Sequence, residues 1–172
     1  MDPDRRDSLR RDVRLPFRWQ ALAAPLPSAE LAKLFELPPA LQLSGRFADL
    51  EAEFAAVSQN VHEPAVALAL EVTNARITAL QEGLLTQHPT PPEATLEIAA
   101  SGIAFTAAVT LSVGSYIGIW LVLPRCYHVL CMARVCRCKQ VEGGYRLAAE
   151  LLTETMDGAG SKRLSRFISA NN

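Results

Sequence analysis

Two series of apolar residues, spaced alternately three and four positions apart, occupy the middle of this 172-residue chain and constrain its fold more than any other feature. The first series ends just before Pro64 and consists of Phe47, Leu50, Phe54, Val57 and Val61. The second follows that proline and consists of Val66, Leu70, Thr73, Ile77, Leu80 and Leu84. Such spacing places each series on one narrow stripe of a helix. The sequence therefore predicts two helices, or one helix kinked at Pro64, each with a coiled-coil seam.

These seams have two interpretations. They pack against each other in an intramolecular hairpin, or they bind the seams of other copies of the chain. A core-facing helix usually has a broader apolar stripe, whereas a strict two-in-seven seam is typical of interhelical supercoiling. Alanines within the second series favour a helix and allow close approach of a partner. We expect self-association through at least one seam.

The rest of the chain alternates with the period of β-strands. Five strands are expected after a proline-rich loop at residues 86–92: Ala94–Ala99, Ile103–Ala107, Ser115–Leu123, His128–Lys139 and Tyr145–Leu152. A sixth is expected at Val13–Leu22, where Pro16 favours an edge position. Six short antiparallel strands suit a small barrel.

Two further helices complete the expected α+β fold. Ser28 is expected to cap a short helix that runs to Glu36, and a C-terminal helix is expected at Ser161–Ala170. Leu164, Phe167 and Ile168 of the second helix are expected on the mouth of the barrel. The organisation that follows is a basic arm and first strand at 1–22, a helical insertion at 28–87, and the remainder of the barrel with the last helix at 93–172.

Residues 98–123 carry no charge, and this length could cross a bilayer as one helix. Three glycines and several hydroxyl side chains within the run favour two strands instead. A single-pass membrane anchor remains the less favoured alternative. The N-terminal residues are charged and lack the apolar segment of a signal peptide, which predicts a cytoplasmic protein.

Four cysteines, Cys126, Cys131, Cys136 and Cys138, lie close together in the sequence, and such a cluster is a candidate zinc site. Their spacing follows the alternation of a strand rather than C-x-x-C turns, with Cys131 on one face and Cys136 and Cys138 on the other. We expect free thiols, no metal and no cofactor. The three histidines, His62, His88 and His128, lack an acid or nucleophile at a recognisable spacing, so we do not expect an enzyme.

Six of the fourteen arginines lie within the first eighteen residues, and the chain has only three lysines. The planar, forked guanidinium suits phosphate, carboxylate or base edges. Arg10, Arg11 and Arg14 form an RRxxR motif directly before the expected first strand. A second segment, Glu97 to Gly102 (EIAASG), lies where the second strand turns into the third.

These segments and the ordered strands resemble the PilZ domain family, which comprises bacterial receptors and adaptors for cyclic di-GMP. Family members carry RxxxR before the first barrel strand and D/N-x-S-x-x-G at the second turn. The resemblance covers the arm and residues 94–170. The heptad-bearing insertion resembles the atypical tetrameric PilZ type, in which inserted helices form a coiled coil.

The resemblance implies a non-enzymatic signalling adaptor and a homo-oligomer, with the tetramer favoured and the two seams as its contacts. It implies cyclic di-GMP as ligand, bound by Arg10, Arg11, Arg14, Glu97, Ser101 and Gly102. Glu97 replaces the shorter Asp or Asn of the motif and Ala99 replaces its serine, so two hydrogen-bonding groups are lost and binding is expected to weaken. The alternative is a PilZ-like scaffold that acts only through protein contacts with an unknown partner. Neither a nucleic acid nor a membrane is expected as a partner.

Overall fold

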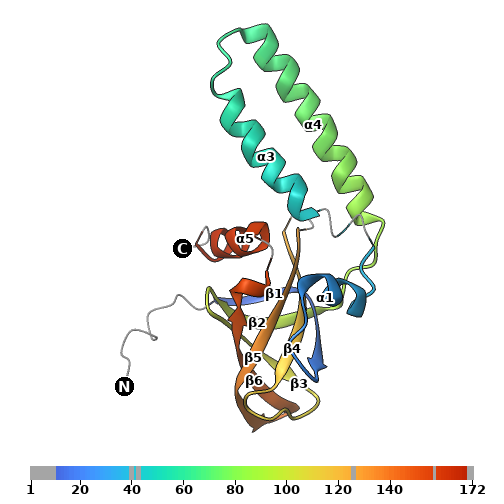
Figure 1. Ribbon diagram of the computed structural model, residues 1–172, viewed down its shortest axis with the longest axis vertical. Helices are drawn as coiled ribbons and strands as arrows, with labels where there is room; N and C mark the ends of the chain where they lie inside the picture. The colour runs from blue at the N-terminus through green and yellow to red at the C-terminus, as the bar shows by residue number, and fades with distance from the viewer. Residues whose placement is uncertain (1–10, 39–40, 42–43, 125–126, 157, 170–172) are drawn as a thin grey trace.

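The chain forms a β-barrel from which a long helical hairpin projects, as the computed structural model shows (Figure 1). The structure describes residues 11–38, 41, 44–124, 127–156 and 158–169. Within these residues the helices lie at one end and on one side of the barrel, and the turn between its last two long strands lies at the opposite end (Figure 1).

Six antiparallel strands close the barrel in the order β1-β2-β3-β6-β5-β4, which confirms the predicted fold. Their bounds are β1 Arg11–Leu22, β2 Glu93–Ala99, β3 Gly102–Ala107, β4 Tyr116–Leu123, β5 Tyr127–Val141 and β6 Gly144–Leu152. Alternate residues point inward because successive side chains of a strand lie on opposite faces. Leu96, Ile98 and Phe105 are thereby buried, and the ring of Phe105 packs against Phe17 with 4.9 Å between centroids.

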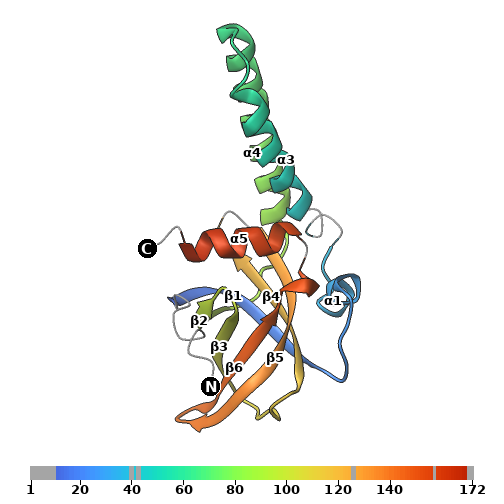
Figure 2. The ribbon, with the colours of Figure 1, turned by 60° about the vertical axis from the view of Figure 1, so that its left-hand side comes forward.

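Helix α5 (Gly158–Ser169) follows a short 3-10 turn, η2 (Thr153–Thr155), and lies across the barrel end from which the hairpin projects (Figure 2). Leu164 and Ile168 are buried in the same core cluster as the inward-facing strand residues, and Phe167 packs at its edge. The prediction that these three residues close the barrel mouth is confirmed.

Pro16 does not lie on a sheet edge, so that prediction is wrong. β1 pairs with β2 as far as Pro16 and with β4 from Phe17 onward. Pro16 therefore sits where the strand changes partner, and the amide of Phe17 donates instead to the carbonyl oxygen of Pro92 at 3.0 Å. A residue without an N–H is tolerated at this point because the next residue supplies the hydrogen bond.

Helix α1 (Ser28–Leu34) packs on the outside of β4 and β5. Pro27 occupies the cap position and no side chain caps the helix, so the predicted capping role of Ser28 is wrong. Gly118 of β4 lies beneath α1, where an added Cβ would be 3.0 Å from Cδ2 of Leu31. Beside it, Phe35 and Trp120 form part of a second apolar cluster between helix and barrel.

A β-bulge between Val135 and Arg137 shifts the register of β5 against β6. Cys131 is buried in the core, and burial raises the pKa of its thiol to about 12. Cys136 is exposed at the bulge, whereas Cys138 packs partly against the core. The prediction that Cys136 and Cys138 share a face is wrong because the extra residue reverses the alternation beyond it. Cys126 lies outside the described residues.

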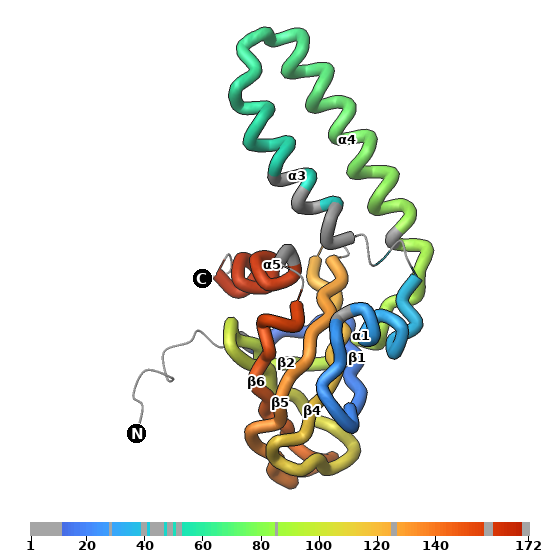
Figure 3. The backbone as a smooth tube through the Cα atoms, viewed as in Figure 1, coloured from blue at the N-terminus to red at the C-terminus, as the bar shows by residue number. Residues whose placement is uncertain are grey.

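Helices α3 (Ser44–Ser58) and α4 (Pro64–Thr86) form an antiparallel hairpin, so the insertion contains two helices and not one kinked helix (Figure 3). The uncharged run at 98–123 forms the end of β2, then β3, a loop and β4, which rules out one long helix there. Among the described residues, no helix has the length and apolar character needed to cross a membrane.

Candidate functional surfaces

The two motif segments lie side by side because β1 pairs with β2. Asp12 lies opposite Glu97 in the register, and Arg14 lies opposite Thr95. Arg14 and Glu97 therefore occupy the outer face of adjacent strands. Arg11 begins β1 opposite Ile98, and Arg10 lies outside the described residues.

Glu97 forms an ion pair with Arg146 of β6. The Arg146 guanidinium donates to the carboxylate at 3.0 Å, and both side chains are about two-thirds buried, with exposures of 29% for Glu97 and 34% for Arg146. The pair spans β3, which lies between β2 and β6. Glu97 stands where the D/N-x-S-x-x-G motif has its Asp or Asn. The negative charge of its carboxylate is thus already neutralised by Arg146 of the same chain.

Arg14 is also paired within the chain. Its Nε lies 2.8 Å from Oε2 of Glu93, but this pair is largely exposed, with exposures of 74% and 54%. Exposed ion pairs of this kind contribute about 0–1 kcal/mol. Arg14 can therefore exchange partners more easily than Arg146 can.

The turn of the second motif consists of Ala100 and Ser101. Ser101 is exposed, and its carbonyl oxygen accepts a hydrogen bond from the amide of Leu151 at 3.0 Å. Gly102 begins β3, and an added Cβ would lie 3.1 Å from the carbonyl oxygen of Ala149. This glycine permits close approach of β6, so its role in the described structure is to pack backbone against backbone.

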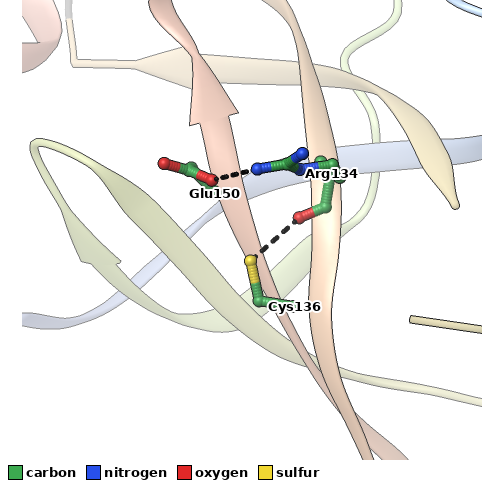
Figure 4. Close-up of polar contacts among 3 residues, drawn as sticks. All are labelled: Arg134, Cys136 and Glu150. Carbon is green, nitrogen blue, oxygen red and sulfur yellow. Dashed lines mark hydrogen bonds and ion pairs between the residues drawn. The ribbon is translucent and has the colours of Figure 1, made fainter. Parts of the chain in front are cut away.

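A further cross-strand pair lies on the neighbouring strands. Arg134 of β5 donates to Glu150 of β6 at 3.0 Å, and that hydrogen bond is the main cause of a raised pKa for Arg134 (Figure 4). The Cys136 thiol lies beside this pair and donates to the carbonyl oxygen of Arg134 at 3.4 Å. Sequence reasoning missed Glu93, Arg146 and this pair. Alternation in GYRLAAEL is a signal that could have put Arg146 and Glu150 on the outer face, but the register between strands is needed to find their partners.

His128 is the one described polar residue in the buried set, and it lies in the apolar layer beneath α1. Its Nδ1 accepts a hydrogen bond from Nε1 of Trp120 at 3.0 Å, and the two rings stack with 5.8 Å between centroids. Burial, with a smaller contribution from nearby His88, lowers the pKa of His128 to about 4. The imidazole is therefore neutral at neutral pH. No group of three or more His, Cys, Asp or Glu able to hold a metal is found in the described part of the chain.

The hairpin divides the predicted seam residues into two sets. Four are half-buried: Phe47, Phe54, Val61 and Leu70. Seven remain exposed: Leu50, Val57, Val66, Thr73, Ile77, Leu80 and Leu84. Exposure reaches 69% for Leu80 and 66% for Val57. Intramolecular packing thus uses only part of the seam and leaves a long apolar surface on α3 and α4.

Thr73 is compatible with that apolar surface. Its hydroxyl donates to the carbonyl oxygen of Ala69 at 2.8 Å, within the same helix. The polar group is satisfied locally, so the methyl group can lie in an apolar contact without an unpaired donor. A partner helix can therefore bury the exposed surface without leaving the Thr73 hydroxyl unpaired, so the desolvation penalty is small.

The sequence matches no protein-family model and no curated protein. The structure is similar to a solved protein from Xanthomonas campestris described as a new tetrameric PilZ domain self-assembled via an unusual helical bundle. The TM-score is 0.62 at 15% sequence identity, with 96% of this chain and 89% of that chain covered. The barrel with its helical insertion is therefore a PilZ-like fold, as the motif order predicted.

Proposed function

We propose that the protein is a non-enzymatic signalling adaptor of PilZ type, which works in the cytoplasm as a homo-oligomer, with the tetramer favoured. The observation that carries this proposal is the row of exposed apolar residues at heptad spacing on α3 and α4. Full burial of one Leu, Ile or Val side chain stabilises a protein by about 1.5–3 kcal/mol. Six such residues of the predicted seam exceed 40% exposure, so burying them against a partner helix would stabilise an oligomer substantially.

Self-association is favoured over a different protein partner for two reasons. The exposed residues keep a regular heptad repeat along α4, which is the pattern that pairs a helix with copies of itself. The similar Xanthomonas protein is itself described as self-assembled through a helical bundle. Both support assembly through the hairpin.

For the barrel, the geometry favours the scaffold alternative over a cyclic di-GMP receptor. An anionic dinucleotide on the outer face of β1 and β2 would meet Asp12, Glu93 and Glu97. It would have to compete with Glu93 for the guanidinium of Arg14. The Glu97 carboxylate is already paired with Arg146. In the receptor alternative, Arg10, Arg11, Arg14, Glu97, Ser101 and Gly102 remain the proposed ligand contacts.

Light scattering after gel filtration tests the assembly. The wild-type chain is expected to elute as an oligomer, and Ile77→Glu with Leu80→Glu is expected to yield monomers because buried charges are strongly unfavourable. Glu71→Gln is the matched control, since Glu71 is an exposed α4 residue outside the seam. A monomeric wild-type protein would refute the proposal.

Calorimetric titration with cyclic di-GMP distinguishes the two barrel alternatives. We expect no saturable heat at micromolar ligand concentrations. Saturable binding that disappears in Arg10→Ala and Arg14→Ala would instead establish the receptor.

A further inference from the structure

Helix α4 carries a second apolar series beside the predicted seam. Ala65, Leu68, Val72, Ala75 and Ala79 follow a 3-4-3-4 spacing, which is again a heptad repeat. All five side chains are exposed, with exposures of 62% for Leu68 and 46% for Val72. We call this series the second seam, and the series from Val66 to Leu84 the first seam.

The two seams lie on different sides of α4. At 3.6 residues per turn, their centres are about 140° apart around the helix axis. One of the two helix faces that separate the seams is half-buried against α3. It includes Ala67, Asn74, Thr78 and Gln81. A helix with two separate apolar stripes can bury both only by packing against more than one other helix. One partner in the first seam would leave the second seam in water.

Helix α3 offers a surface that matches the second seam. Leu50 and Val57 are seven residues apart, are exposed by 52% and 66%, and are not covered by the chain's own α4. α3 has 15 residues, so it is about 21 Å long between its first and last Cα atoms, the same length as the span from Ala65 to Ala79. Three of the five second-seam residues are alanines, which allow another helix to approach closely.

Symmetry determines which parts of the two helices meet. In copies related by an axis along α4, each residue lies at the same height in every copy. Within the hairpin, α3 runs antiparallel to α4 and lies beside it (Figure 2). The exposed edge of α3 in one copy is thus at the height of the second seam in the next.

We propose that the second seam of α4 binds the Leu50–Val57 edge of α3 from a neighbouring copy. This inference rests on the proposed self-assembly and specifies how it closes. Each chain contacts two others, one through its second seam and one through its α3 edge. Such head-to-tail contacts close into a ring of three or more chains and cannot stop at a symmetric dimer.

Sedimentation velocity across a dilution series tests this proposal in the full-length protein. We expect Leu68→Gln with Val72→Gln to raise the concentration of half-dissociation at least tenfold, and Leu50→Gln with Val57→Gln to do the same. Because both pairs remove one contact, combining all four changes should add little to either pair. All four side chains are exposed in the single chain, so helix content by circular dichroism should not change. Glu71→Gln is the control.

The outcomes separate this inference from the proposed self-assembly. An oligomer that is sensitive to Ile77→Glu but keeps its wild-type dissociation in both glutamine pairs would overturn the second-seam contact alone. A wild-type monomer would overturn the proposed self-assembly as well.

The occupant of the second seam can be identified directly. A photo-crosslinking amino acid in place of Leu68, in a mixture of isotopically light and heavy chains, should join the light α4 peptide to the heavy α3 peptide. Crosslinks only between light peptides would mean that the chain's own α3 covers the seam. Crosslinks to the heavy α4 peptide would mean that α4 packs there instead. Either result would overturn the proposed contact.

Discussion

The guanidinium of Arg146 lies 3.0 Å from the carboxylate of Glu97, although the two residues belong to strands separated by β3. On β3, Thr106 lies opposite Arg146, and Ala104 lies opposite Glu97. The small side chain of Ala104 leaves room for the longer side chains of Glu97 and Arg146 to meet. A glutamate at position 97 is long enough to reach Arg146 across β3. The aspartate of the D/N-x-S-x-x-G motif is one methylene shorter, so its carboxylate would extend less far toward Arg146.

Restoring the motif should therefore restore ligand binding. Glu97→Asp with Ala99→Ser shortens the acid and supplies the missing hydroxyl. Each hydrogen bond gained contributes about 0.5–1.5 kcal/mol, so the two together should strengthen cyclic di-GMP binding roughly tenfold or more. In calorimetry, the double variant should show saturable heat at ligand concentrations where the wild type shows none. Adding Arg14→Ala to the double variant is the control and should remove the gain; an equal affinity of wild type and double variant would contradict the role assigned to these positions.

Burial of His128 should make stability depend on pH. Its folded pKa of about 4 is below the ordinary value of 6.5, so the unfolded chain binds more protons between these values. Stability from this group is fully present above pH 6.5 and is lost as pH falls toward 4. Between pH 7.5 and pH 5 the expected loss is about 2 kcal/mol.

Urea unfolding at a fixed protein concentration measures this loss, since assembly also contributes to apparent stability. His128→Gln should reduce the difference between the two pH values. His62→Gln changes an exposed histidine near the hairpin turn and should leave it intact. If His128→Gln kept the full wild-type difference, other groups would be responsible.

Gly118 should be required for docking of α1. A Cβ there would lie 3.0 Å from Leu31 Cδ2 and 3.5 Å from atoms of both Leu34 and Phe35. Leu31 is fully buried and has little room to move, so Gly118→Val should destabilise the fold by about 1–3 kcal/mol. The near-UV signal of Trp120, which packs on Phe35, reports the displacement locally. Gly83→Ala is the control, because nothing lies within 4 Å of its added Cβ. Unchanged near-UV spectra in Gly118→Val would show that α1 adjusts without undocking.

The strands of the barrel could be predicted because one face of each is buried. The alternation of Leu96, Ile98 and Ile103, for example, follows directly from their inward positions. The helical character of the insertion could be predicted from its heptads, which left open whether Pro64 separates two helices or kinks one. Irregular features could not be predicted in the same way. The bulge beside Cys136 and the change of partner at Pro16 depend on pairing between distant segments.

The candidate sites were predicted less completely than the fold. The resemblance assigned Glu97 and Arg14 to one ligand site, but within the chain Glu97 pairs with the guanidinium of Arg146 and Arg14 pairs with the carboxylate of Glu93. Those partners are set by register, which alternation does not specify. Similarly, heptad spacing identified Leu80 and Phe54 as seam residues, but not that Leu80 is exposed while Phe54 is half-buried in the hairpin.

Gly144 should tolerate substitution far less than its neighbour Gly143. Both have positive φ, 148° and 83° respectively, at the turn that joins β5 to β6. A Cβ on Gly144 would overlap the backbone carbonyl oxygen of Ala107 in β3, whereas nothing lies within 4 Å of one on Gly143. Gly143→Ala should cost about 1–2 kcal/mol from backbone conformation alone. Gly144→Ala adds a clash with paired backbone that cannot rotate away, so its loss in free energy of unfolding should exceed that of Gly143→Ala by at least about 1 kcal/mol. Urea unfolding of the two variants compares them directly, and equal losses would mean that β3 moves aside at no cost.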